Sequence, residues 1–303
     1  MDNKYTVPIA TAVVICTGVL WGFYWLPVRE LTRFGMTGPW GTFAITFSAS
    51  ILMLPFAICL RKQFSKASSI AIASATIGGA AFALYSIGFV YGRVSIIILL
   101  FFLTPVWSTL IGRFIMGWQT PNMRIWAIIV GVSGLGVMLS ADGTAPFPRN
   151  AGEWMALSSG ILWSVATTGI KAEANLKPIA ATFVFACGAS ALSLIFALLL
   201  EPMPDAPIIG PVLSLAFSTG GLWWCLSMLA LMWAALKLEP ARVGILLMAE
   251  VLVGALTSAI WAGEHLSKLE LIGGALVICA GVLEVWPLKK DPITLRVKNG
   301  TAI

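Results

Sequence analysis

The sequence predicts an all-α integral membrane protein with ten transmembrane helices, arranged as two inverted five-helix repeats. Three observations lead to this fold class. Hydrophobic residues make up 59% of the 303 residues and charged residues only 11%, whereas an average soluble domain has roughly 25% charged residues. Apolar runs near the ~20 residues that cross a bilayer recur along almost the whole chain. The two halves of the chain also resemble each other in sequence.

Polar breaks divide the chain into ten apolar segments, which we expect to be the membrane-spanning helices. The predicted helices cover residues 8–32, 39–60, 68–91, 95–118, 123–141, 152–172, 178–200, 209–236, 241–262 and 269–287. In chain order, the clearest breaks are Gly38-Pro39, Arg61 to Gln63, Thr120 to Asn122, Pro146 to Asn150, Pro202 to Pro207 and Glu239-Pro240. These stretches combine charged residues with residues that end helices. Pro27, Pro55 and Pro105 lie inside predicted helices, where we expect kinks.

The basic residues fall mainly on one side of the predicted membrane. Arg29, Arg33, Arg93, Arg149 and Lys268 lie on the minority side. The majority side has Lys4, Arg61, Lys62, Lys66, Arg113, Arg124, Lys171, Lys177, Lys237, Arg242, Lys289, Lys290, Arg296 and Lys298. Because cytoplasmic loops collect Lys and Arg, this bias predicts that both termini are cytoplasmic, as an even number of spans requires. We interpret Arg29, near the end of its span, as a snorkelling cation.

An internal repeat relates the two halves. Gly18 to Trp21 aligns with Gly160 to Trp163, and Pro105 aligns with Glu250 after one short insertion. Chance similarity between helices rich in Gly and Leu is the alternative explanation. Each half has five predicted spans, and an odd number of spans turns the second repeat upside down relative to the first. The predicted units are residues 1–146 for the first repeat, 147–288 for the second, inverted repeat and 289–303 for a basic cytoplasmic tail.

Three stretches carry a resemblance to a known family, namely Gly18 to Trp21, Gly160 to Trp163, and Gly263-Glu264 through to Gly281. They resemble the paired EamA-type repeats of the drug/metabolite transporter superfamily. Within it, the chain resembles bacterial exporters of aromatic amino acids. The resemblance implies a secondary transporter in the bacterial inner membrane that exports aromatic or neutral amino acids by alternating access. The first repeat departs from the pattern, because Trp118-Gln119 stands where the second repeat has Gly263-Glu264.

Glu250 is the most informative single residue, since it lies about midway along the ninth predicted span. A buried carboxylate there costs several kcal/mol unless it faces water, a partner or a proton. We therefore expect Glu250 to couple transport to protons or to anchor the amino group of a substrate. The structural alternative is a neutral side chain that hydrogen-bonds to a neighbouring helix.

Aromatic residues deep in the spans form the second candidate feature. Trp21 and Trp163 occupy equivalent positions in the two repeats, and Trp107 lies well inside the fourth span. Aromatic faces in a central cavity stack on flat rings or hold a cation, although helix packing explains any one of them equally well. The predicted substrate-binding set is Trp21, Tyr24, Tyr85, Phe89, Trp107, Trp163, Trp224, Met228 and Glu250.

Other functional classes find little support. The single histidine, His265, falls in a predicted external connection, and the chain has no common hydrolase, metalloprotease or Walker A motif;. The five cysteines have no metal-type spacing, and the basic residues form no stripe for nucleic acid. We expect no enzyme activity, cofactor, metal or nucleic-acid partner, only a small-molecule substrate and the lipid bilayer. Hydrophobic or quaternary cations and other metabolites are alternative substrates, and a channel, sensor or scaffold is the alternative class.

Overall fold

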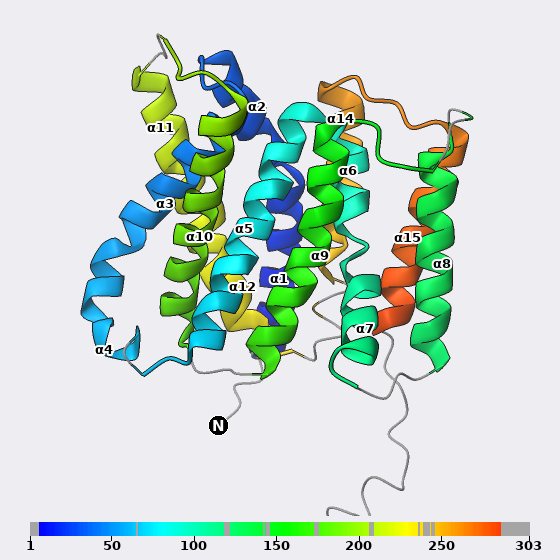
Figure 1. Cartoon of the computed structure of the whole chain (residues 1–303), viewed down its shortest axis with the longest axis horizontal. Helices are drawn as coiled ribbons and strands as arrows, with labels where there is room; N and C mark the ends of the chain where they lie inside the picture. Colours follow the sequence, from blue (N-terminus) through cyan, green and yellow to red (C-terminus); the bar gives the residue numbers. More distant parts are fainter. Residues whose placement is uncertain are drawn as a thin grey trace, which may run out of the picture.

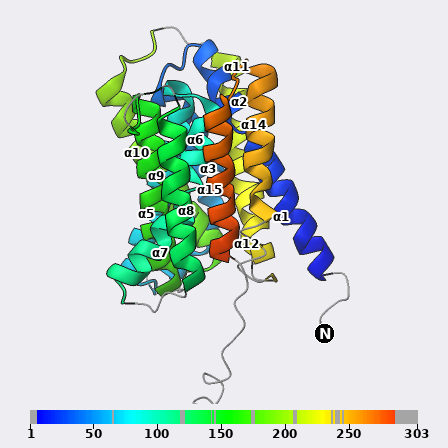
Figure 2. The ribbon, with the colours of Figure 1, turned by 90° about the vertical axis from the view of Figure 1, so that its right-hand side faces the viewer.

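The computed structural model describes residues 6–64, 66–117, 122–141, 143, 146–172, 176–205, 209–235, 237–238, 243 and 246–285, and these residues form helices without strands. The helices lie side by side in one bundle (Figures 1 and 2). Within the described part of the chain, seven helices are long and apolar enough to cross a membrane. They are Thr6–Arg33, Pro39–Cys59, Ser69–Tyr91, Val94–Phe114, Asn122–Leu139, Pro178–Leu200 and Ile209–Leu231.

Each of the ten predicted segments contains at least one helix. In chain order the helices are α1 (Thr6–Gly22), α2 (Trp25–Arg33), α3 (Pro39–Cys59), α4 (Arg61–Phe64), α5 (Ser69–Tyr91), α6 (Val94–Phe101), α7 (Thr104–Phe114), α8 (Asn122–Leu139), α9 (Ala151–Ala172), α10 (Pro178–Leu200), α11 (Ile209–Thr219), the π-helix η1 (Gly220–Ser227), α12 (Met228–Ala235), α14 (Ala249–Trp261) and α15 (Lys268–Val285). The short helix α4 alone falls outside the predicted segments, in the break that begins at Arg61. The all-helical class is confirmed. Ten crossings stay a prediction, because α9, α14 and α15 are not among the seven long apolar helices. Several predicted boundaries, the Trp118-Gln119 pair and the basic tail 289–303 lie outside the described residues.

Two predicted spans of the first half are broken near the middle of the bundle and not merely kinked. α1 ends before Phe23 and α2 follows, and α6 ends at Phe101 before α7 starts. Pro27 and Pro105 fall in the first turns of α2 and α7, where the missing N–H of proline leaves no intrahelical hydrogen bond unmade. The expected kinks at these two prolines are therefore helix restarts, while Pro55 stays inside α3.

The chain runs back and forth between two ends of the bundle (Figure 1). α1 begins and α15 ends at the end drawn at the bottom, which we call the lower end. α2 ends, and α3 and α15 begin, at the opposite end, which we call the upper end. The first and last described helices therefore place their outer ends on the same side of the bundle.

Small residues allow close contact between helices from the two halves. α5 packs against α9 and α10, and α8 packs against α15. A Cβ atom added to Gly79 would lie 1.9 Å from the carbonyl oxygen of Phe185, and one added to Gly134 would lie 2.8 Å from the carbonyl oxygen of Gly273. Such approaches are the usual means of helix association in a bilayer.

Candidate functional site

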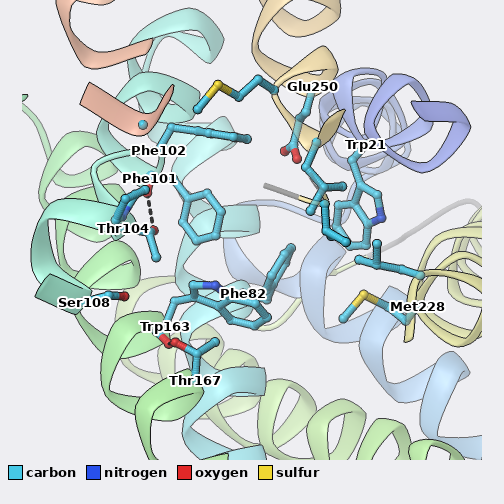
Figure 3. A pocket seen from close by; sticks show the side chains of 16 residues that line it. Trp21, Phe82, Phe101, Phe102, Thr104, Ser108, Trp163, Thr167, Met228 and Glu250 are labelled. Carbon is cyan, nitrogen blue, oxygen red and sulfur yellow. Dashed lines mark hydrogen bonds between the residues drawn. The ribbon is translucent and has the colours of Figure 1, made fainter. Parts of the chain in front are cut away.

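A cavity of about 550 Å³ lies inside the bundle, and both halves of the chain line it. Its walls come from α1, α5, α6, α7, α9, α12, α14 and α15. In Figure 3, Glu250, Trp21 and Met228 lie on one side of the cavity, and Thr104 and Ser108 lie on the opposite side. The volume falls within the ~300–1,000 Å³ of pockets that hold small molecules.

Aromatic rings form much of the cavity wall. Phe82 of α5 packs edge-on against Trp21 at 4.9 Å and against Trp163 at 5.0 Å between ring centroids. Phe101 packs against Phe82 at 5.5 Å. Edge-to-face contacts of this kind are favourable beyond the area they bury, so the rings hold one another in place. The wall presents ring faces and edges drawn from both halves of the chain.

Glu250 is the one charged residue among the described residues that line the cavity. It is the second residue of α14, where the helix N-terminus favours a negative charge;. The hydroxyl of Tyr85 donates a hydrogen bond of 2.7 Å to its Oε1 atom. Tyr85 is itself fully buried between the rings of Phe89 and Phe101. The carboxylate is therefore held from behind by one donor while it faces the cavity.

Hydroxyl groups of α7 and α9 face the cavity opposite Glu250. The side chains of Thr104, Ser108 and Thr167 line this wall. Thr104 donates its hydroxyl to the carbonyl of Phe101 at 2.5 Å, and Thr167 donates to the carbonyl of Trp163 at 2.8 Å. Because these two donors bond within or next to their own helices, their oxygens retain capacity to accept hydrogen bonds from a solute.

The structure separates the nine predicted site residues into two groups. Those that line the cavity are Trp21, Trp163, Met228 and Glu250. Those that do not are Tyr24, Tyr85, Phe89, Trp107 and Trp224, which pack in the core around it. Whether any of the nine binds a substrate stays a prediction.

The buried aromatic residues behind the cavity form a hydrogen-bonded cluster. Trp224 donates its indole N–H to the Tyr24 hydroxyl at 3.0 Å, and this hydroxyl lies 3.0 Å from the Oγ of Ser86. Trp21 donates its indole N–H to Ser227 at 2.9 Å. Each polar atom of these large rings is satisfied inside the protein, as buried polar groups require. The cluster therefore fixes the orientation of Trp21 at the cavity wall.

Several lining residues were not predicted. Phe82 lies three residues before Tyr85, so it projects from the same face of α5, and that spacing was the available signal;. Pro105 lies on the cavity wall at the position that the repeat aligns with Glu250. Each is the second residue of a helix that starts beside the cavity. The alignment could thus have pointed to the start of α7.

Arg29 is not the snorkelling cation that the sequence predicts. Its Nη2 atom lies 2.9 Å from Oε1 of Glu264, in an ion pair at the upper end. The same guanidinium donates to the carbonyl oxygens of Phe89 and Gly92, each at 2.9 Å. A guanidinium with three protein partners is a structural tie between elements, not a charge extended toward the lipid surface.

A helical membrane bundle with a solute-sized cavity between two related halves is the architecture of a membrane transporter. The model of the EamA-like transporter family matches the chain twice, over residues 8–140 and 150–285. The chain therefore belongs to the EamA-like transporter family of the drug/metabolite transporter superfamily. The predicted pair of EamA repeats and the function of membrane solute transport are confirmed. The finer resemblance to exporters of aromatic amino acids stays a prediction.

Comparison with solved structures supports the fold of the chain and carries no information about its substrate. Among them, 24 chains match. One, a crystal structure described only as that of a protein, has a TM-score of 0.57 and 16% sequence identity, and the alignment covers 96% of this chain and 99% of the other. The search of curated proteins finds no match.

Proposed function

We propose that this chain exports small organic solutes that carry an aromatic ring and an ammonium group, by alternating access of the cavity. Aromatic amino acids are the first candidates. The observation that carries the proposal is the Glu250 carboxylate, which is the one charged group among the described lining residues, in a wall that is otherwise mostly aromatic and apolar. A buried carboxylate attracts an ammonium group, and the surrounding rings accept a flat ring or a cation.

The cavity has separate places for the two ends of such a solute. The ammonium group would bind the carboxylate of Glu250, whose other contact is the Tyr85 hydroxyl. The aromatic ring of the solute would pack against Phe82 and Trp163, whose ring centroids lie 5.0 Å apart. The hydroxyls of α7 and α9 would contact polar substituents. Binding of both ends in one cavity would select for length as well as for charge.

A second candidate is the export of hydrophobic or quaternary organic cations. The specific observation in its favour is that Glu250 is the one charged residue among the described lining residues. A monovalent cation would neutralise this carboxylate, whereas the carboxylate of an amino acid would also need a donor. Glu250 would then exchange the cation for a proton in each cycle.

The proposed membrane arrangement has ten spans in two inverted repeats, residues 1–146 and 147–288, followed by the tail 289–303. The two family matches, 8–140 and 150–285, support two units of similar extent. α1 begins and α15 ends at the lower end, which supports termini on one side. The excess of basic residues on that side supports a cytoplasmic lower end;. The bacterial inner membrane is proposed from the family resemblance.

The test is uptake of labelled tryptophan, phenylalanine and tryptamine into proteoliposomes, with and without an imposed pH gradient. We expect saturable uptake by the wild type and a loss of about tenfold or more in Glu250→Gln, because a hydrogen bond or ion pair to a charged group contributes ~1.5–3 kcal/mol. Glu30→Gln is the control, since Glu30 pairs with Arg33 on the surface of α2.

The outcomes separate the candidates. Tryptamine uptake without tryptophan uptake would favour the cation class, and the reverse would favour amino acids. Accumulation driven by a pH gradient and lost in Glu250→Gln would support proton coupling. Unsaturable flux would indicate a channel. Flux that Glu250→Gln leaves unchanged would contradict the assigned role of the carboxylate.

A further inference from the structure

Two ion pairs connect the two halves of the chain at the upper end of the bundle. Arg29 of α2 pairs with Glu264 at 2.9 Å, and Arg93, between α5 and α6, pairs with Glu270 of α15 at 2.6 Å. We propose that these two pairs are the gate that closes the cavity toward the upper end, and that each transport cycle breaks and remakes them. This inference rests on the proposed alternating-access function.

The Arg29 pair joins three separate segments. Its guanidinium also donates to the carbonyls of Phe89 and Gly92, at the end of α5. The second carboxylate oxygen of Glu264 accepts from the backbone N–H of Ser95 in α6 at 3.3 Å. Loss of this one carboxylate would therefore release α2 and α6 from the connection before α15 at the same time.

The Arg93 pair is held by a helix cap. Ser267 and Glu270 form the reciprocal contacts of a capping box, in which Glu270 Oε2 accepts from the Ser267 N–H at 2.7 Å;. Arg93 donates to Glu270 Oε1, and its Nη2 atom donates to the carbonyl of His265 at 2.8 Å. The start of α15 is thus built to present a carboxylate to the other half of the chain.

Both pairs are partly buried, which suits a reversible contact. The Glu264 and Glu270 side chains are 10% and 5% exposed, and Arg29 and Arg93 are 30% and 38% exposed. Partial burial reduces screening, so these pairs are stronger than a surface pair. The guanidinium groups still reach solvent, so they can be rehydrated when the pairs separate. The Arg33–Glu30 pair at the same end is 78% and 40% exposed and lies within one helix.

Tightly packed helices lie between these pairs and the cavity. Every residue of α6 is buried, and Ile98 packs so closely on α14 that a Cβ atom added to Gly254 would lie 2.1 Å from its Cδ1 atom. The hydroxyls of Ser95 and Ser258 lie 2.7 Å apart across the same contact. The lining residues of α9 and α15, by contrast, come from the lower halves of these helices, as Thr167 and Gly281 illustrate. The structure is thus closed above the cavity, and opening there must part α6 from α14.

Cysteine labelling tests the gate without requiring transport. In the full-length test protein, the five natural cysteines, Cys16, Cys59, Cys187, Cys225 and Cys279, are first replaced. A single cysteine is then introduced into the cavity wall by the change Ser108→Cys. A membrane-impermeant maleimide is applied from either side in oriented vesicles. We expect the double change Glu264→Gln and Glu270→Gln to raise labelling from the upper side several-fold and to lower it from the lower side. Glu30→Gln, which removes the surface pair, should change neither rate.

Opposite changes in labelling from the two sides distinguish gate opening from loosening of the bundle, because a loosened bundle would label faster from both sides. A rise from both sides, or no change from either side, would overturn the proposal. The conservative changes Glu264→Asp and Glu270→Asp, which keep both carboxylates, guard against a variant that misfolds, since they should keep labelling from the upper side low. Failure of the proposed function is a separate result, because absence of flux in the proteoliposomes leaves the labelling rates measurable.

Discussion

Tyr85 contacts Glu250 and is not among the residues that line the cavity, so in the proposed transporter it would act on a bound solute only through the carboxylate. Its ring is fixed by Phe89 at 4.7 Å and Phe101 at 4.6 Å. A rigid donor removes rotational freedom from Glu250 in advance, and such preorganisation lowers the cost of binding. Both residues belong to the predicted substrate-binding set; in the structure Glu250 lines the cavity, and Tyr85 lies behind it with its hydroxyl bonded to the carboxylate.

Replacement of Tyr85 by Phe should therefore weaken binding and leave the ring packing intact. We expect the KM for the transported solute to rise by about tenfold, because a hydrogen bond to a charged group contributes ~1.5 kcal/mol or more. Tyr91→Phe is a matched control, since it removes a tyrosine–glutamate bond of 2.7 Å to Glu201 outside the cavity. Equal effects of the two changes on KM would contradict the positioning role of Tyr85.

Sequence reasoning identified Glu250 because a carboxylate in a span is costly wherever it points. It did not identify Phe82, because α5 is buried on almost every side and the one available signal was the spacing of three residues from Tyr85. The orientation of an aromatic ring depends on neighbours from distant segments, here Trp21 and Trp163. The ion pair of Arg29 was missed for the same reason, because Glu264 is far away in the sequence.

At the scale of elements, hydropathy predicted where most of the long helices lie, but it did not predict where a helix stops and restarts or changes its winding. The predicted segment 39–60 differs by one residue from α3, and 178–200 coincides with α10. The π-helix η1 within the predicted span 209–236 had no recognisable signal. It contains Trp223 and Trp224, whose indole N–H groups reach Leu20 and Tyr24 of the first half. Tertiary contacts of this kind decide where a helix changes its winding.

The contact between α5 and α10 depends on the absence of a side chain at Gly79. Gly79→Ala would place a Cβ atom 1.9 Å from the carbonyl oxygen of Phe185, and overpacking of this kind costs ~1–3 kcal/mol. We expect a lower melting temperature in detergent, measured by tryptophan fluorescence. Gly136→Ala is the control, since no atom of a described residue lies within 4 Å of the added atom. A Gly79→Ala protein as stable as this control would show that the helices separate at little cost.

At the scale of the whole molecule, the direction of each helix predicts which loops share a side of the membrane. α10 runs from the lower end at Pro178 to the upper end at Leu200. Alkaline phosphatase fused after Glu201 should be active, since the proposed topology exports it, and the same enzyme fused after Ala172 should be inactive. A fluorescent protein fused to the C-terminus should fluoresce, because the proposed topology keeps the C-terminus in the cytoplasm. Activity at both phosphatase sites would contradict the proposed orientation.

The ion pairs at the upper end also bear on how the carrier would meet its solute from each side. If they favour the form whose cavity faces the lower end, solute from above must bind a sparsely populated form, and its apparent dissociation constant rises by the inverse of that population. Binding would then be tight from one side and weak from the other, with identical contacts in the cavity. The solute or ion gradient still fixes the direction of net movement, and the four charged residues set only the concentration at which each side saturates.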